Sequence, residues 1–181
     1  MDTELVVQAQ RGDEEAFASL AVAVGNRLHA IAHRILRDLE LAEDATQQAL
    51  LSIWRDLPQL RDPARFEAWS YRLLVRACYA EARKTHHWTP GLRLVETDEH
   101  VSDASGSVAD RDQLERAFRR LSVDHRAVVV LHHYLDLPLP EVAKALGIPP
   151  GTARSRLHYA MRGLRAALDA DDRPASREAT P

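Results

Sequence analysis

The side chains with the clearest potential for chemistry lie in one basic stretch near the C-terminal end of the sequence. Over residues 150–168, hydrogen-bond donors recur on one side of an expected helix, and no Asp or Glu occurs between Pro150 and Ala167. Arg side chains pair with guanine edges and phosphates, and Ser or Thr hydroxyls pair with either, so this chemistry is recognition of nucleic acid rather than catalysis. The candidate donors to duplex DNA are Thr152, Arg154, Ser155, Arg156, His158, Tyr159 and Arg162.

The residues around these donors have the pattern of a helix-turn-helix. A short helix is expected over residues 140–146, Gly147 supplies the positive φ of a tight turn, and a longer helix begins at Pro150. A helix in this position can place its first turns in a major groove. A solvated basic helix in a purely structural hairpin is the alternative that this pattern alone leaves open. The expected buried stripe of the second helix is Ala153, Leu157, Ala160 and Leu164.

The net charge of -3 conceals an uneven distribution along the chain. Residues 61–84 carry six Lys or Arg against three Asp or Glu, and residues 110–168 carry ten against six. The remaining segments are acidic. Two basic blocks on different parts of one chain favour contact with a polyanion at two places.

Other chemistry has little support. Cys78 is the single cysteine, which excludes an internal disulfide and a cysteine-based zinc site, and it is expected to be a buried apolar residue. His29 and His33 are four residues apart, but the H-E-x-x-H pattern and a third ligand are missing. Gly-rich phosphate loops and nucleophile elbows are absent too. We therefore expect no catalytic residue, no metal site, no cofactor and no enzymatic activity.

Helical periodicity dominates the whole chain and indicates an all-α fold. We expect two small helical modules joined by a flexible linker, the second module being the helix-turn-helix. The chain has no apolar run long enough for a membrane span and no signal-peptide pattern, so no membrane insertion and a cytoplasmic protein are expected. The expected modules are residues 1–84 and 110–168, with a linker over 85–109 and a disordered tail over 169–181.

The first module is expected to begin with two helices separated at Gly12-Asp13, followed by helices over 42–57 and from Pro63 to about residue 83. In the second module, helices are expected over residues 110–121, 123–134, 140–146 and 150–168.

Three segments, taken in order, resemble the motifs of one protein family. The segment LAEDATQQALLSIWRDL at 41–57 resembles region 2.2 of bacterial sigma factors of the extracytoplasmic function (ECF) group, in the sigma-70 family. The segment RDPARFEAWSYRLL at 61–74 resembles the opening of region 2.4, and residues 122–165, with GTARSRLHYA, resemble region 4. The resemblance covers nearly the whole chain. It implies a factor that binds core RNA polymerase and directs transcription initiation at promoters with -35 and -10 elements.

The resemblance also assigns surfaces. The helix-turn-helix would read the -35 element, and the loop 57–65 with the following helix would read the -10 element through Leu60, Arg61, Arg65, Arg72, Arg76, Arg83 and Lys84. The contact with the β′ clamp helices of polymerase would be made by Asp44, Gln47, Gln48, Leu51 and Trp54. Trp54 is also expected to be partly a core residue. Phe66 and Trp69 are expected in the module core rather than as stacking platforms.

Some positions depart from the family pattern. Arg76 stands where the family usually has Asn, and Ala80 stands where it often has Asp or Asn, which leaves base choice at the -10 element open. Pro138 replaces the usual Ser N-cap of the first helix in the helix-turn-helix, and Pro140 follows in its first turn. Proline is tolerated there because these amide positions have no helical partner.

The resemblance further implies promoter DNA and the polymerase β flap as partners, together with an anti-sigma factor that no residue identifies. A rival interpretation is a free-standing helix-turn-helix regulator whose N-terminal module senses a ligand or dimerises. A third, enzymatic interpretation rests on the histidines alone and would require bound metal. Dependence on core polymerase separates the first two, since a regulator shifts promoter DNA without it.

Overall fold

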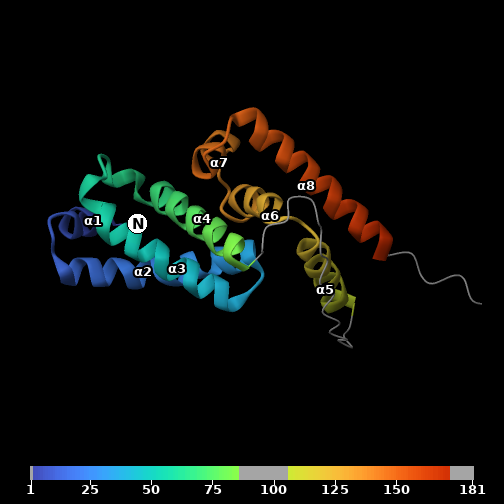
Figure 1. Ribbon diagram of the computed structural model, residues 1–181, viewed down its shortest axis with the longest axis horizontal. Helices are drawn as coiled ribbons and strands as arrows, with labels where there is room; N and C mark the ends of the chain where they lie inside the picture. The colour runs from blue at the N-terminus through green and yellow to red at the C-terminus, as the bar shows by residue number, and fades with distance from the viewer. Residues whose placement is uncertain (1, 86–105, 172–181) are drawn as a thin grey trace, which may run out of the picture.

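The computed structural model describes residues 2–85 and 106–171, and all regular secondary structure in these two ranges is helical (Figure 1). The expected all-α class is thereby confirmed. Most of the expected linker and most of the expected tail, residues 86–105 and 172–181, lie outside the described residues.

Four helices form the first module: α1 (Thr3–Gln10), α2 (Glu14–Leu36), α3 (Leu39–Asp56) and α4 (Phe66–Thr85). The expected break between the first two is confirmed. Gly12 has a φ of 91°, and the Asp13 side chain then caps α2 by accepting from the Ala16 amide at 3.0 Å. Asp38 caps α3 in the same way through the Leu41 amide at 2.9 Å, so α3 begins three residues earlier than expected.

The core of the first module is built around α3, which packs against both α2 and α4. Its buried side is lined by Ala42, Ala45 and Ala49, each with no exposed surface. Such small side chains let neighbouring helices approach closely, and the larger Ile53 and Phe66 fill the ends of the contact. The opposite side of α3 is therefore left facing solvent.

The second module contains α5 (Gly106–Arg119), α6 (Val123–Val129), α7 (Leu139–Leu146) and α8 (Pro150–Asp171). Helix α5 begins at Gly106, four residues before the start expected for the first helix of this module. Also, α8 continues three residues beyond its predicted end. The two helices pack together, and the Gln113 amide donates to the Leu168 carbonyl at 3.1 Å. This long-range contact joins the middle of α5 to the C-terminal part of α8.

The predicted single helix over 123–134 changes character halfway. After α6 the chain continues as a π-helical turn, Val130–Tyr134, and the Leu135 amide donates to the Val130 carbonyl at 3.2 Å. Residue Asp136 then takes a φ of 53°, and His132 Nδ1 lies 2.8 Å from the Leu137 carbonyl. These contacts direct the chain into α7.

The turn of the helix-turn-helix has the predicted geometry. Gly147 takes a φ of 67°, and the Ile148 amide donates to the Ala143 carbonyl at 3.0 Å. Ala143 is buried, and Ile148 packs partly buried against the core. Pro138 occupies the N-cap position of α7 without a side-chain hydrogen bond, as its sequence predicts.

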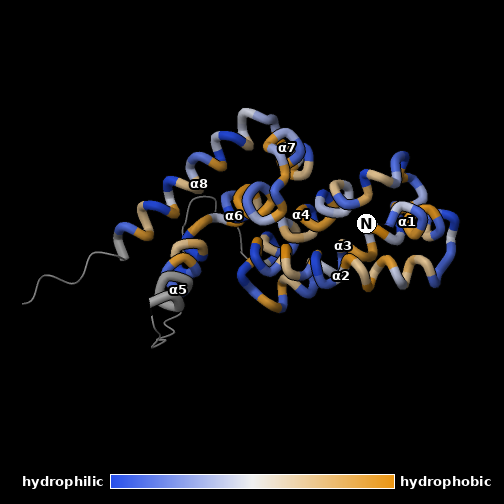
Figure 2. Tube along the Cα trace, turned by 180° about the vertical axis from the view of Figure 1, so that it is seen from behind, coloured by the Kyte–Doolittle hydropathy of each residue, from blue (hydrophilic) through white to orange (hydrophobic). Residues whose placement is uncertain are grey.

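The two modules pack on each other, which the sequence did not predict. Helix α7 lies against α4, and α6 contacts both α2 and α4 (Figure 1). Hydrophobic and hydrophilic residues alternate along these helices, as expected for helices buried on one side (Figure 2). The buried apolar residues of both modules form one continuous cluster. Among the described residues, no helix is both long enough and apolar enough to span a bilayer.

Candidate nucleic-acid interface

The predicted recognition helix α8 has one buried side and one basic exposed side. Ala153 and Ala160 have no exposed surface and Leu164 is 6% exposed, whereas Leu157 is half-buried. The exposed side carries five of the seven predicted donors, Arg154, Ser155, His158, Tyr159 and Arg162, together with Arg165. A shallow groove of about 320 Å³ follows this side and is lined by Arg154, Leu157, His158, Met161, Arg162 and Arg165.

The other two predicted donors are half-buried. Arg156 Nη1 lies 2.9 Å from Asp124 Oδ1 in the first turn of α6, so this arginine is ion-paired within the module. The Thr152 carbonyl accepts a hydrogen bond from the Ser155 hydroxyl at 3.0 Å. Spacing along α8 could not reveal the role of Arg156, since its partner lies 32 residues earlier.

The predicted -10 surface begins in two short 3₁₀ turns, Leu57–Gln59 and Pro63–Arg65. Gln10 of α1 holds this loop, because its side-chain amide donates to the Leu60 carbonyl at 2.7 Å and to the Leu57 carbonyl at 3.1 Å. Sequence reasoning missed Gln10, as nothing in its local pattern predicts a contact about 50 residues away. The predicted Leu60 is half-buried, and Arg61 and Arg65 are exposed.

Basic residues continue along α4. Arg72, Arg76, Arg83 and Lys84 are all exposed. Two residues of the surface have local acidic partners: Arg65 Nε lies 3.3 Å from Asp62 Oδ2, and Lys84 Nζ lies 2.8 Å from the nearly buried Glu81 carboxylate. Arg72, Arg76 and Arg83 are exposed along one helix, and Arg61 is exposed in the loop before it, as phosphate contacts require.

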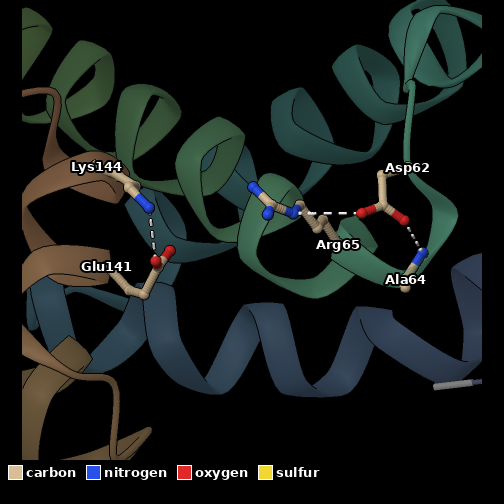
Figure 3. A network of polar contacts seen from close by, with 5 residues as sticks. All are labelled: Asp62, Ala64, Arg65, Glu141 and Lys144. Carbon is tan, nitrogen blue, oxygen red and sulfur yellow. Dashed lines mark hydrogen bonds and ion pairs between the residues drawn. The ribbon is translucent and has the colours of Figure 1, made fainter.

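The aromatic pair at the start of α4 divides between core and surface. Phe66 is 1% exposed, which confirms it as a core residue. Trp69 is half-buried, with its ring centroid 6.0 Å from that of Phe66, and it lines a cleft of about 310 Å³ between α4 and α7. Figure 3 shows Asp62 and Arg65 on one side of this region and Glu141 and Lys144 of α7 on the other. The lining residues are Leu60, Arg61, Asp62, Arg65, Ala68, Trp69, Arg72, Leu137, Glu141, Lys144 and Ala145.

The predicted polymerase surface lies together on the solvent side of α3. All five of its residues, Asp44, Gln47, Gln48, Leu51 and Trp54, are exposed. Leu51 is 61% exposed and Trp54 is 44% exposed, while Ala45 and Ala49 are fully buried beneath them. The Trp54 ring also meets the Phe17 ring edge-on at 4.5 Å, so this tryptophan is packed on one edge and open on the other. Exposed large apolar side chains within a polar rim are typical of a partner surface.

Cationic side chains gather where α2 meets the second module. Arg37, at the left-handed C-cap of α2, pairs with Glu115 of α5, and its guanidinium lies 6.0 Å from the Phe118 ring centroid. Burial and the neighbouring Arg37 lower the pKa of Arg126 to about 10. Burial and nearby arginines also lower the pKa of Arg37 and of His33. The Nε atoms of Arg37 and Arg126 are buried without a hydrogen-bond partner.

Comparison with protein families gives two matches in chain order. Residues 20–88 match Sigma-70 region 2, and residues 111–164 match Sigma-70, region 4. The first match contains α3, α4 and the loop between them, and the second contains α6, α7 and most of α8.

Relatives along the full chain have consistent names. The ECF RNA polymerase sigma factor SigM of Mycobacterium tuberculosis is 33% identical over 169 residues, covering 92% of this chain and 84% of the relative. The RNA polymerase sigma-H factor of Pseudomonas aeruginosa is 28% identical and covers 98% of this chain and 97% of the relative.

Solved structures share the fold. CnrH, solved in complex with the cytosolic domain of CnrY, superposes with a TM-score of 0.66 at 26% identity, covering 94% of this chain and 98% of CnrH. The sigma factor RpoE of Bartonella quintana, solved in complex with the anti-sigma factor NepR, has a TM-score of 0.65 at 23% identity over 86% of this chain and 98% of RpoE, and shows likeness of fold alone.

Proposed function

The chain belongs to the ECF group of RNA polymerase sigma factors in the sigma-70 family. From this premise we propose which of its surfaces bind the promoter elements and which surface binds core polymerase. It binds core RNA polymerase and directs promoter-specific transcription initiation by recognising -35 and -10 elements. The observation that carries this function is the ordered pair of sigma-70 region matches, each lying over a module with an exposed basic surface. The bond-forming chemistry belongs to the polymerase.

The -35 element is assigned to α8. Arg154, Ser155 and His158 share one side of the helix within about a turn of each other, because steps of three and four residues return to the same face. They also lie near the N-terminal end, which enters the major groove in helix-turn-helix proteins. Arg154 and Arg162 are exposed in the same groove and are available to base edges or phosphates. Arg156 is assigned a supporting role through its ion pair with Asp124.

The -10 element is assigned to the loop 57–65 and the exposed side of α4. Taking one base out of the stack costs a few kcal/mol, which a fitted pocket and phosphate contacts must offset. The loop is fixed by Gln10, and the side chains of Arg61, Arg72 and Arg76 stand exposed beside it. Trp69 is the aromatic side chain on this surface that a base could reach.

Core polymerase is assigned to the exposed side of α3, centred on Leu51 and Trp54. By analogy with relatives that work with RNA polymerase, we place the protein in the cytoplasm. A structural neighbour was solved with an anti-sigma factor, and we propose a partner of that class for this chain as well. The proposed module limits are residues 1–84 and 110–168, extended by the observed helices to residues 85, 106 and 171.

A band-shift assay with and without purified core polymerase tests this function against a free-standing regulator. A labelled promoter fragment is expected to shift with the chain and core polymerase together, and to stay unshifted with the chain alone at the same concentration. Core polymerase without the chain serves as the control for nonspecific binding. A sequence-specific shift by the chain alone would instead favour the regulator.

A further inference from the structure

Arg156 leaves the recognition helix on a different side from the donor that lies closest to it in the groove. Arg154 and Arg156 are two residues apart, which corresponds to a rotation of about 200° around the axis of α8. The Arg156 side chain is 26% exposed, and its Nη1 atom lies 2.9 Å from Oδ1 of Asp124. Its guanidinium is therefore directed along the flank of α8 that faces α6.

Asp124 is held in place by its own helix. It lies in the first turn of α6, after the N-cap Ser122, whose hydroxyl accepts a hydrogen bond from the His125 amide at 3.3 Å. A carboxylate in this turn is favoured by the dipole of the helix. Further along α6, Ala127 and Val128 have no exposed surface, so the helix is anchored in the core of the module.

Helix α8 packs on the rest of its module through small residues. Ala153 and Ala160 have no exposed surface, and a Cβ added to Gly163 would lie 3.4 Å from the Leu121 side chain, just before α6. Helices that approach this closely leave little room for a long side chain between them. The ion pair of Arg156 lies at the edge of this contact and joins α8 to α6 there.

A third group lies beside the pair. Burial and the Asp124 carboxylate raise the pKa of the Tyr79 hydroxyl in α4, and the Arg156 guanidinium acts in the opposite direction. An ion pair next to a buried ring is screened less by water than a fully exposed pair. Asp124 and Arg156 both belong to the second module, so their ion pair does not require α4.

An arginine that is already paired with a carboxylate adds little to the electrostatic part of DNA binding. That part comes from cations that neutralise phosphates and release the counterions condensed on DNA. The Arg156–Asp124 pair has no net charge, whereas Arg154 and Arg162 are exposed in the groove of α8. Phosphate contacts position a protein on the duplex but carry no direct sequence information. Withholding one of them leaves a larger share of the binding to base contacts.

We propose that Asp124 is a positioning residue of the -35 interface: it holds the Arg156 guanidinium against α6 and away from the DNA phosphates. Arg156 then stabilises the position of the recognition helix and makes no contact with DNA. This inference rests on the proposed function and deepens it, because it specifies which donors of α8 reach the promoter. It also lowers non-specific binding, which depends on phosphate contacts.

The test measures the affinity of the chain with core polymerase for promoter fragments, over a series of salt concentrations from about 50 to about 200 mM. The fragments carry several -35 variants and one common -10 element. Asp124→Asn removes the charge that pairs with Arg156, and Asp124→Glu keeps it. Arg156→Gln removes the guanidinium, and the double variant Asp124→Asn/Arg156→Gln removes both charges. The matched control is Asp169→Asn, which removes one negative charge at an exposed position in the last turn of α8.

Asp124→Asn should steepen the slope of log affinity against log salt by about one, because the released Arg156 gains a phosphate contact. A decrease in salt from about 200 to about 50 mM should then raise the affinity roughly threefold more than in the parent chain, equally for every -35 variant. The parent slope should be retained by Asp124→Glu, Arg156→Gln, the double variant and Asp169→Asn. A purely structural role of Asp124 would not steepen the slope.

Three outcomes would overturn the proposal. A slope lowered by about one in Arg156→Gln would show that this arginine contacts a phosphate in the parent chain. An unchanged slope in a folded Asp124→Asn variant would show that the carboxylate does not hold Arg156 away from DNA. Equal steepening by Asp169→Asn would attribute the effect to net charge. Thermal melts establish folding, and the Arg156→Gln slope decides alone if Asp124→Asn does not fold.

The same measurements separate this proposal from the proposed function. If the parent chain with core polymerase binds all -35 variants equally, the proposed function is wrong and the role of Asp124 is wrong with it. If the parent chain discriminates among the -35 variants and the slopes differ from those expected, only the role of Asp124 is wrong.

Discussion

At the scale of single residues, exposure on α8 separates side chains that the sequence had grouped together. Arg154 is exposed near the N-terminal end of the helix, Arg156 pairs with Asp124, and Arg165 lies about three turns beyond Arg154. The donor types and their common side were predictable from a 3.6-residue period. The pairing of Arg156 with Asp124 was not predictable, because the partner comes from another helix.

Arg154→Ala is expected to change which -35 variants are transcribed, and Arg165→Ala is expected to lower transcription uniformly or leave it unchanged. Loss of a base-reading arginine costs about 1–3 kcal/mol at one position, whereas loss of a phosphate contact weakens all sequences alike and lowers the salt slope by about one. The measurement is transcription from several -35 variants with a common -10 element at two salt concentrations. A uniform decrease with Arg154→Ala would show that the helix supplies charge and no base readout.

Cys78 is expected to be inert to thiol reagents in the native chain. It has no exposed surface, and burial raises the pKa of its thiol to about 12, so the reactive thiolate is scarce at pH 8. Modification measured at pH 8 should be negligible without denaturant and complete in its presence. Both the sequence and the structure place Cys78 in a buried apolar environment. Rapid labelling of the native chain would therefore mean that α4 opens locally.

At the scale of elements, the turn between α7 and α8 depends on one backbone conformation. Gly147→Ala should lower the free energy of unfolding by about 1 kcal/mol, because alanine is disfavoured at a φ of 67° although no atom lies within 4 Å of the added Cβ. Gly151→Ala is the matched control, with the same open space and no positive φ. Thermal melts should show a decrease of about 2–4 °C for the first variant alone. Equal melting temperatures for the two variants would show that the positive φ at Gly147 does not disfavour alanine there.

Substitutions on the exposed side of α3 are expected to weaken polymerase binding without lowering the stability of the chain. Asp44→Arg reverses a charge and Gln48→Glu adds one, both on a surface away from the buried Ala45 and Ala49. Binding to core polymerase should weaken at least tenfold for Asp44→Arg, while the melting temperature stays within about 2 °C because surface changes are usually worth under 0.5 kcal/mol. Ala49→Leu is the contrasting variant, expected to destabilise the module. Parallel loss of binding and folding in Asp44→Arg would make this surface structural.

Helix boundaries show where local sequence stops being informative. Asp13, Asp38 and Gly147 are short-range signals, and the elements they cap or end were predictable or nearly so. Helices α5 and α8 pack on each other through residues such as Gln113 and Leu168, which lie 55 positions apart, and no local window contains such a contact. The π-helical turn at Val130–Tyr134 likewise lies within a stretch whose sequence predicts an ordinary helix.

At the scale of the whole molecule, the two-module organisation followed from the sequence but the contact between the modules did not. The residues that join them include charged and polar side chains, among them Arg34, Arg37, Glu115 and Tyr134, which carry no periodic signal. Each module's pattern is explained by its own core, so the additional contact leaves no trace in the hydrophobic periodicity. It became visible from the arrangement of α4 against α7.

Run-off transcription is the most direct test of the central claim that this chain gives core polymerase its promoter specificity. Purified chain and core polymerase are combined on a matrix of templates that vary the -35 and -10 elements independently. Transcripts should require the chain, start at one position, and fall when either element is changed. Initiation by core polymerase that is unaffected by the chain, or that is indifferent to both elements, would contradict the account.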